Sequence, residues 1–164
     1  MRIIRVLAGS AAVIAAAAGV GLAAAGPASA SLPPGGGALA GSWRAFGGNN
    51  PIATSSSTWL CESSVPIGVN VVAQVCVVSA ADDSSVQPAV IVRNNKATEY
   101  DAQASMSMVA TNPGKSASYI CSPSGVAPNS WSVCFGASVS NVGRAFVRGT
   151  AGNSVNLGQT PPVI

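Results

Sequence analysis

The amino-acid sequence predicts an all-β domain, an antiparallel β-sandwich or barrel of about eight short strands. Three observations favour this fold class. Apolar and polar residues alternate with a period of two, turn-forming residues separate the alternating segments, and an aromatic-aliphatic-cysteine order occurs twice. The last observation predicts two internally repeated units, each stapled by its own disulfide.

The N-terminus has the pattern of a secretion signal. Within residues 1–30, two arginines precede an apolar run over 6–25, and the small residues Ala28-Ser29-Ala30 follow it. We therefore expect cleavage after Ala30 and a secreted, extracellular protein. The alternative is a retained transmembrane anchor, because the run is about long enough to span a bilayer.

Composition excludes several classes of function. Two of the eight Lys and Arg residues lie in the expected signal and none of the five acids does, so the remaining chain has a formal charge of +1. Scattered cations cannot neutralise a run of phosphates, so we expect no nucleic-acid partner. The absence of histidine excludes Ser-His-Asp and Cys-His nucleophiles, and we expect neither metal nor cofactor. After the signal, no apolar run reaches membrane-spanning length.

Residues 31–57 are rich in Gly, Pro, Ser and Asn, which predicts a flexible leader. Trp43 and Phe46 are the exceptions within it. They either dock on the domain as a first strand or stand as isolated aromatic residues in a linker.

Residues 58–164 form the expected β-domain, with repeat one at 58–110 and repeat two at 116–160. The order Trp59-Leu60-Cys61 recurs as Tyr119-Ile120-Cys121, and in each unit a second cysteine follows in an apolar strand. Each unit then has an apolar segment that ends in arginine and a further alternating strand.

Two segments show the strand pattern clearly. In residues 98–108 the even positions are mostly apolar and the odd positions are polar. Residues 69–77 place five apolar side chains on one face, those of Val69, Val71, Ala73, Val75 and Val77. A helical period fits neither segment. Turn residues separate the strands at 82–85, 94–96, 112–114 and 149–153.

The four cysteines predict two disulfides, as is usual in small exported chains. If each unit carries its own bridge, the pairs are Cys61–Cys76 and Cys121–Cys134, each contributing about 3 kcal/mol by loop closure. The second cysteine of each pair lies opposite its apolar neighbours on the strand, so we expect both bridges to lie away from the main core. A redox pair or a zinc site would need closer cysteine spacing.

Few residues suggest chemistry. Glu99 and Asp101 share one strand face, as paired glycosidase carboxylates can, but an amphipathic strand has such a solvated face without any catalytic role. Arg93 and Arg148 recur at the same place in each unit, which predicts a shared structural task such as binding a carbonyl or covering an aromatic ring.

In general plan the chain resembles small exported all-β proteins of actinomycetes, which combine an Ala-rich signal with a Ser/Gly/Val-rich domain and sequential disulfides. The α-amylase inhibitors of the tendamistat type have a similar pair of successive disulfides. The Trp-Arg-Tyr triplet that characterises them is absent between Cys61 and Cys76, so the resemblance implies no functional residue.

These observations predict a non-enzymatic binding module with no catalytic residue. Its expected partner is an extracellular protein or a cell-wall carbohydrate, because a rigid scaffold with polar loops suits binding. Aromatic residues and arginine dominate contact energies, so the candidate surface is Trp43, Arg44, Phe46 and Trp131. One alternative is a self-associating surface or coat protein, and another is a histidine-independent glycan hydrolase that uses Glu99 and Asp101.

Overall fold

The computed structural model describes residues 37–163, and within them the chain is all-β, with twelve strands and no helix. The expected signal and the start of the expected leader lie outside these residues. Because the described part has no helix at all, it has none that could cross a membrane.

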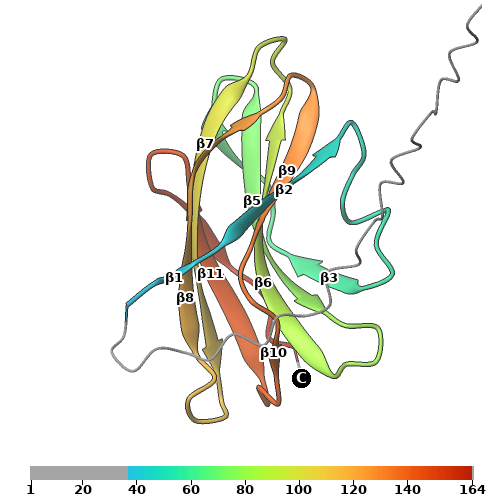
Figure 1. The fold of residues 1–164 in the computed structure, drawn as a ribbon, viewed down its shortest axis with the longest axis vertical. Coiled ribbons are helices and arrows are strands. Elements are labelled where there is room, and N and C mark those ends of the chain that lie inside the picture. Colours follow the sequence, from blue (N-terminus) through green and yellow to red (C-terminus); the bar gives the residue numbers. More distant parts are fainter. Residues whose placement is uncertain (1–36, 164) are drawn as a thin grey trace, which may run out of the picture.

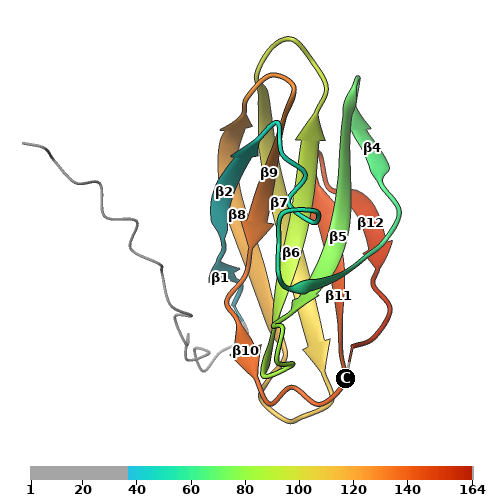
Figure 2. The same cartoon turned by 90° about the vertical axis from the view of Figure 1, so that its right-hand side faces the viewer.

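The strands form two sheets. The five-stranded sheet contains β1 (Leu39–Ala40), β7 (Tyr100–Ala110), β8 (Ala117–Val126), β11 (Ala145–Ala151) and β12 (Val155–Gln159), in the order β1-β8-β7-β11-β12. The seven-stranded sheet contains β2 (Ser42–Gly47), β3 (Thr58–Cys61), β4 (Val65–Gly68), β5 (Val71–Ser79), β6 (Ser85–Asn94), β9 (Ser130–Phe135) and β10 (Val139–Ser140). Its order is β2-β9-β6-β5-β3, with β4 beside β5 and β10 beside β6. The two sheets lie as two layers (Figures 1 and 2).

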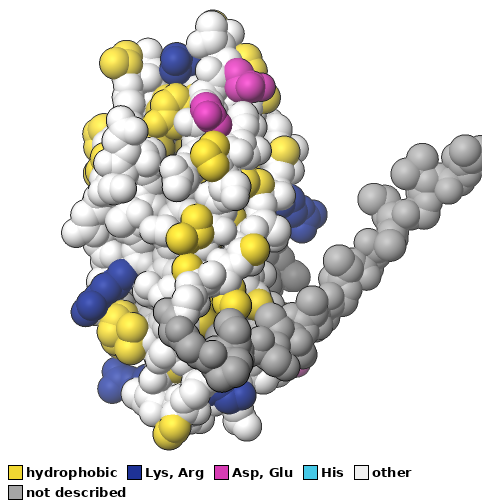
Figure 3. All heavy atoms as spheres, turned by 60° about the vertical axis from the view of Figure 1, so that its left-hand side comes forward, with side chains coloured by type: hydrophobic (Ala, Val, Ile, Leu, Met, Phe, Trp, Pro, Cys, Tyr) yellow, Lys and Arg dark blue, Asp and Glu magenta, His cyan; other side chains and the backbone are white. Residues whose placement is uncertain are grey.

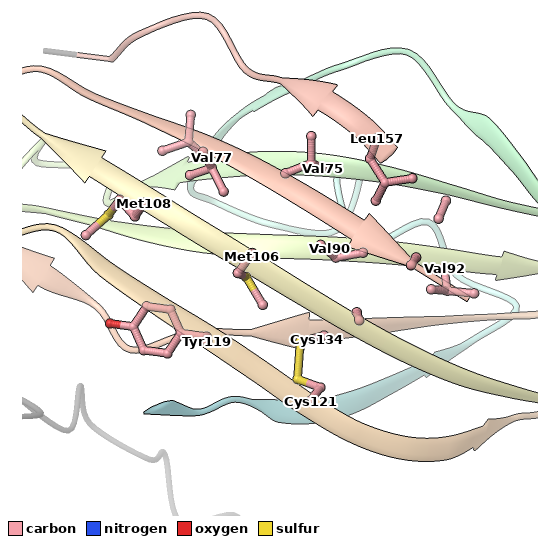
Figure 4. Packing of buried hydrophobic residues seen from close by; sticks show 14 of the residues in the cluster. Val75, Val77, Val90, Val92, Met106, Met108, Tyr119, Cys121, Cys134 and Leu157 are labelled. Atoms are coloured by element: carbon pink, nitrogen blue, oxygen red, sulfur yellow. A yellow bond between two sulfur atoms is a disulfide. The ribbon is translucent and has the colours of Figure 1, made fainter. Parts of the chain in front are cut away.

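The main core lies between the layers. Side chains of β5 and β6 point toward those of β7 and β11, as Val75, Val90 and Met106 illustrate (Figure 4). The predicted alternation is confirmed in β7, where Ala102, Ala104, Met106 and Met108 are buried. Period-two alternation therefore identified a real buried face.

The alternation fails at one end of β5. Val69 is 83% exposed, because the chain turns there between β4 and β5 and Asn70 takes a φ of 56°. The sequence places Val69 on the buried face because its spacing continues the pattern, although the strand itself begins at Val71. A second difference concerns 149–153, where β11 continues to Ala151 and the turn begins only at Gly152.

Part of the expected flexible leader is strand. Leu39 and Ala40 pair with β8 in parallel, and after Gly41 the chain pairs with β9 in antiparallel fashion. At Gly41 the chain changes sheets directly above a disulfide, since a Cβ there would lie 2.7 Å from Cys121 Sγ. Composition suggested flexibility because it does not register pairing with strands that are distant in sequence.

The disulfides join the pairs Cys61–Cys76 and Cys121–Cys134. The first joins neighbouring strands β3 and β5 outside the main core, as the register predicts. The second lies inside the main core and joins β8 of one sheet to β9 of the other. Its expected position away from the core is therefore wrong, because Cys134 faces the opposite layer while Val133 and Phe135 face outward.

The structure does not confirm the internal repeat. The strand with Cys61 is at one end of the seven-stranded sheet, whereas the strand with Cys121 lies between two partners in the five-stranded sheet. The recurrent arginines nevertheless share a role, because the guanidinium of Arg93 lies 4.8 Å from the ring centre of Trp131 and that of Arg148 lies 5.3 Å from that of Phe146.

Asn94 is a buried polar residue at the end of β6 that joins three segments. Its Nδ2 donates to the carbonyl oxygens of Thr98 at 2.9 Å, Val126 at 2.9 Å and Ala127 at 3.1 Å. Its Oδ1 accepts from the Lys96 amide at 2.9 Å. Asn94 thus holds the β6–β7 turn against the end of β8.

Gly149 allows β11 to approach the opposite layer closely. A Cβ at this position would lie 2.9 Å from Cγ2 of Val75 and 3.2 Å from Cγ2 of Val90. We predict that Gly149→Ala lowers the free energy of unfolding by about 1–3 kcal/mol, as overpacked cores do. Urea unfolding measures this change. Gly48→Ala is the matched control, because a Cβ there meets no atom within 4 Å, and an equal loss in both variants would contradict the packing argument.

Candidate functional site

The side of the seven-stranded sheet that points away from the main core carries a second apolar cluster. We call this side the outer face. Five buried residues form the centre of the cluster, namely Cys76, Val78, Ala89, Ile91 and Val133. A sheet face that points away from the core is usually polar, so an apolar one indicates either a covering segment or a ligand surface.

Half of the chain's eight aromatic residues lie on the outer face. Phe46, Trp59, Trp131 and Phe135 are all half-buried and pack against the second cluster. The rings of Trp59 and Phe135 meet edge to face, with centroids 5.9 Å apart. Aromatic side chains outside the core supply large contact areas for binding.

A crossing segment, residues 48–57, covers part of this face. It connects β2 at one edge of the sheet to β3 at the other and passes in front of the strands between them (Figure 2). Pro51 is buried and Ile52 packs on the second cluster, which anchors the segment. Local hydrogen bonds shape it further: the Ile52 amide donates to Asn50 Oδ1 at 3.0 Å, and the Thr54 hydroxyl donates to the Asn50 carbonyl at 3.2 Å.

A hollow of about 490 Å³ lies between the crossing segment and the outer face. Its polar wall comes mostly from the crossing segment and consists of Asn49, Thr54, Ser55, Ser56, Ser57 and Gln87. Its apolar wall consists of Phe46, Pro51, Trp59, Val78 and Phe135. Arg44 is the one charged residue of the lining. The volume falls within the range of small-molecule sites, roughly 300–1,000 Å³.

Trp59, in the apolar wall of the hollow, has a buried nitrogen atom, the indole Nε1, that makes no hydrogen bond to any described residue. An unsatisfied buried donor costs about 1–3 kcal/mol and is rare in folded proteins. The buried hydroxyl of Tyr119 in the main core also lacks a partner among the described residues, so this feature alone does not distinguish the hollow from the core.

The structure brings three of the four predicted binding residues together. Arg44, Phe46 and Trp131 lie on the outer face, because β2 pairs with β9. Trp43 lies on the opposite side of β2, packs on the main core and donates from Nε1 to the Ser122 carbonyl at 2.7 Å. It is therefore a structural residue that docks the first strands.

Trp59, Phe135 and the crossing segment also belong to this surface, although the sequence pattern does not single them out as binding residues. Trp59 is two positions before the disulfide cysteine Cys61, which favours a structural role. Phe135 is next to Cys134 in the strand, so the expectation that Cys134 lies away from the core places Phe135 in the core. The predicted Cys61–Cys76 disulfide could have revealed Trp59. If the two cysteines face each other on neighbouring strands, Trp59 lies opposite Val78, as the structure has it.

The outer side of the five-stranded sheet is different. Its hollow of about 270 Å³ is lined by apolar residues together with three serines, Thr150, Asn156 and Arg148. The hydroxyls bond to one another, Ser105 to Thr150 at 2.8 Å and Ser107 to Ser118 at 2.7 Å. Figure 3 turns this side toward the viewer and shows hydrophobic side chains scattered rather than gathered. The one charged residue that lines this hollow, Arg148, donates from Nε to Gln159 Oε1 at 2.8 Å.

Other chemistry-bearing groups do not assemble into a site. Glu99 and Asp101 are exposed and line neither hollow. Over residues 37–163, no three His, Cys, Asp or Glu side chains are grouped so that they could hold a metal ion. Burial raises the pKa of the Tyr119 phenol, which belongs to the main core.

Comparisons with protein-family models, with curated proteins and with solved structures find no match to this chain.

Proposed function

We propose that this protein is a secreted, non-enzymatic β-sandwich domain that binds carbohydrate in the hollow of its outer face. The observation that carries the proposal is the composition of the hollow. Half-buried aromatic rings form its floor, and a segment rich in hydroxyl and amide groups forms its rim.

This combination suits a sugar ring. The C–H faces of a pyranose are apolar and stack on aromatic rings, whereas its hydroxyls need donors and acceptors around their edge. The hollow offers Trp59 and Phe135 for the first requirement and the serines and threonine of the crossing segment for the second. Seven of the twelve lining residues are polar or charged, which suits a ligand that carries many hydroxyl groups.

The test is calorimetric titration of the domain with soluble polysaccharides, comparing the wild type with Trp59→Ala. We expect this substitution to weaken binding about tenfold or more, because hot-spot aromatic residues contribute at least 1.4 kcal/mol. Phe146→Ala is the matched control, since Phe146 is a half-buried aromatic on the five-stranded sheet. Equal affinity of the wild type and Trp59→Ala for every polysaccharide that binds would contradict the site.

Secretion is the second part of the proposal. It rests on the signal-like pattern of residues 1–30 and on two disulfides, which persist in oxidising compartments. We predict that the protein recovered from the culture medium begins at Ser31, as measured by intact mass. A cell-retained protein with its original N-terminus would instead support a membrane anchor.

Self-association through sheet edges is less well supported than ligand binding. The edge strands are short, β4 contains Pro66, and Pro161 and Pro162 follow β12. Short edges and prolines are the usual protection against edge pairing. Sedimentation over a concentration series tests this alternative, and a strictly monomeric protein would exclude it.

A further inference from the structure

We infer that the carbohydrate is an acidic polysaccharide whose negative groups meet Arg44 and Arg93; this inference rests on the proposed function. The two arginines are the only charged residues in the strands of the seven-stranded sheet. The crossing segment, residues 48–57, adds no charge. The outer face is therefore positive, although the mature chain is nearly neutral.

Stacking fixes both guanidinium groups without neutralising them. Arg44 lies over Phe46 with its Cζ 5.1 Å from the ring centre, and Arg93 lies over Trp131 at 4.8 Å. Both arginines are exposed. A guanidinium that stacks on a ring keeps its N–H edge free for an anion, and the ring reduces the entropy lost when that anion binds.

The acids of the protein lie elsewhere. Asp82 and Asp83 occupy the turn between β5 and β6. Glu99 comes directly before β7 of the other sheet, and Asp101 is the second residue of that strand. Glu62 follows β3 and lies beside Gly158 of β12, since a Cβ on Gly158 would be 3.5 Å from Glu62 Cγ. No acidic strand residue thus competes with a ligand for the two guanidinium groups.

The positions of the arginines favour a polymer over a small anion. Arg44 is on β2 and Arg93 is on β6, and β9 lies between these strands. Arg44 pairs with Val133 and Arg93 pairs with Trp131, so their Cα atoms are two strand spacings apart across the sheet and two residues apart along it, roughly 12 Å. Each guanidinium is stacked on its own ring, Phe46 or Trp131, and a chain with an anionic group on successive sugar units offers a separate charge to each.

The test compares three probes on the full mature domain: polygalacturonate, its fully methyl-esterified form, and polyglutamate. We expect polygalacturonate to bind most tightly, and esterification to weaken binding at least tenfold, because it removes the charge but keeps the sugar. Added salt is expected to weaken binding as well, since exposed charges are screened.

Substitutions of single arginines test where on the domain polygalacturonate binds. Arg44→Gln and Arg93→Gln are each expected to weaken polygalacturonate binding roughly tenfold, as loss of a hydrogen bond to a charged group does. Arg148→Gln is the matched control, because Arg148 stacks on Phe146 in the other sheet and loses the same charge. Thermal unfolding of each variant confirms that the fold is retained.

The outcomes separate the two proposals. If the ester binds as tightly as the acid and Trp59→Ala still weakens binding about tenfold or more, the anionic inference fails and carbohydrate binding stands. If polyglutamate binds as tightly as polygalacturonate, the surface recognises acidic protein chains and the polysaccharide assignment fails. If Arg148→Gln weakens binding as much as the outer-face variants, the attraction is only general charge and the site is wrong. If the domain binds no form of galacturonan but does bind a neutral polysaccharide through Trp59, the inference fails alone.

Discussion

Asn94→Asp is expected to lower the free energy of unfolding by about 3–5 kcal/mol at neutral pH, as an uncompensated buried charge does. Asn94 is 0% exposed, and its Nδ2 faces three carbonyl oxygens. An oxygen in place of that nitrogen cannot donate, so the carboxylate would repel the same carbonyls. The loss is a large share of a domain's typical stability of about 5–15 kcal/mol.

Urea unfolding at several pH values measures this effect. Burial and the surrounding carbonyls raise the pKa of the new carboxyl in the folded state above its unfolded value. The destabilisation is therefore largest at neutral pH and becomes smaller as the pH falls through that raised pKa. Asn95→Asp is the matched control, since Asn95 is the next residue in the chain and is exposed. If Asn94→Asp lowers the free energy of unfolding by less than about 1 kcal/mol, the Asn94 amide does not hold the β6–β7 turn against the end of β8.

Removing the two disulfides is expected to have unequal effects. Each closes a loop of similar length, with sequence separations of 15 and 13, which corresponds to about 3 kcal/mol. The double variant Cys121→Ala/Cys134→Ala also leaves a gap in the main core, because both residues are 0% exposed. We therefore expect about 4–5 kcal/mol for this variant and about 3 kcal/mol for Cys61→Ala/Cys76→Ala.

Chemical unfolding of both double variants measures the difference, and the wild type provides an independent test. Cys61 is only half-buried, whereas Cys121 and Cys134 are covered by both layers. Limited reduction followed by alkylation and mass spectrometry should label Cys61 and Cys76 first. Labelling of Cys121 and Cys134 first, or equal stability of the two variants, would contradict the burial of the second bridge.

The sequence predicts the strands better than it predicts which layer each faces. Alternation in β7 identifies Met106 and Met108 as buried because one face of that strand is polar. In β9 both faces are apolar, so period two shows which residues share a side and not what covers that side. For this reason the pattern predicts Cys134 on the outside and Val133 in the main core, and the structure has the reverse.

The candidate site was partly visible in the sequence. Arg44, Phe46 and Trp131 could be chosen by residue type alone, because aromatic residues and arginine dominate contacts. Their meeting depends on β2 pairing with β9, which is a contact between distant parts of the chain. The crossing segment was hidden for a related reason: its composition predicts disorder, whereas the packing of Pro51 and Ile52 and its local hydrogen bonds order it.

The change of sheets at Gly41 has a consequence for how the molecule assembles. The first strands of the domain depend on partners that are synthesised much later, since Ser42 pairs with Phe135 and Ala40 pairs with Ile120. Contacts of such long sequence separation form slowly, so docking of β1 and β2 is a late event in folding. Until it occurs, β8 and β9 each have an unprotected edge over the newly formed second disulfide. A chain trimmed within its first described residues would keep those edges open permanently, and would then be the form most prone to exchange a strand with another copy.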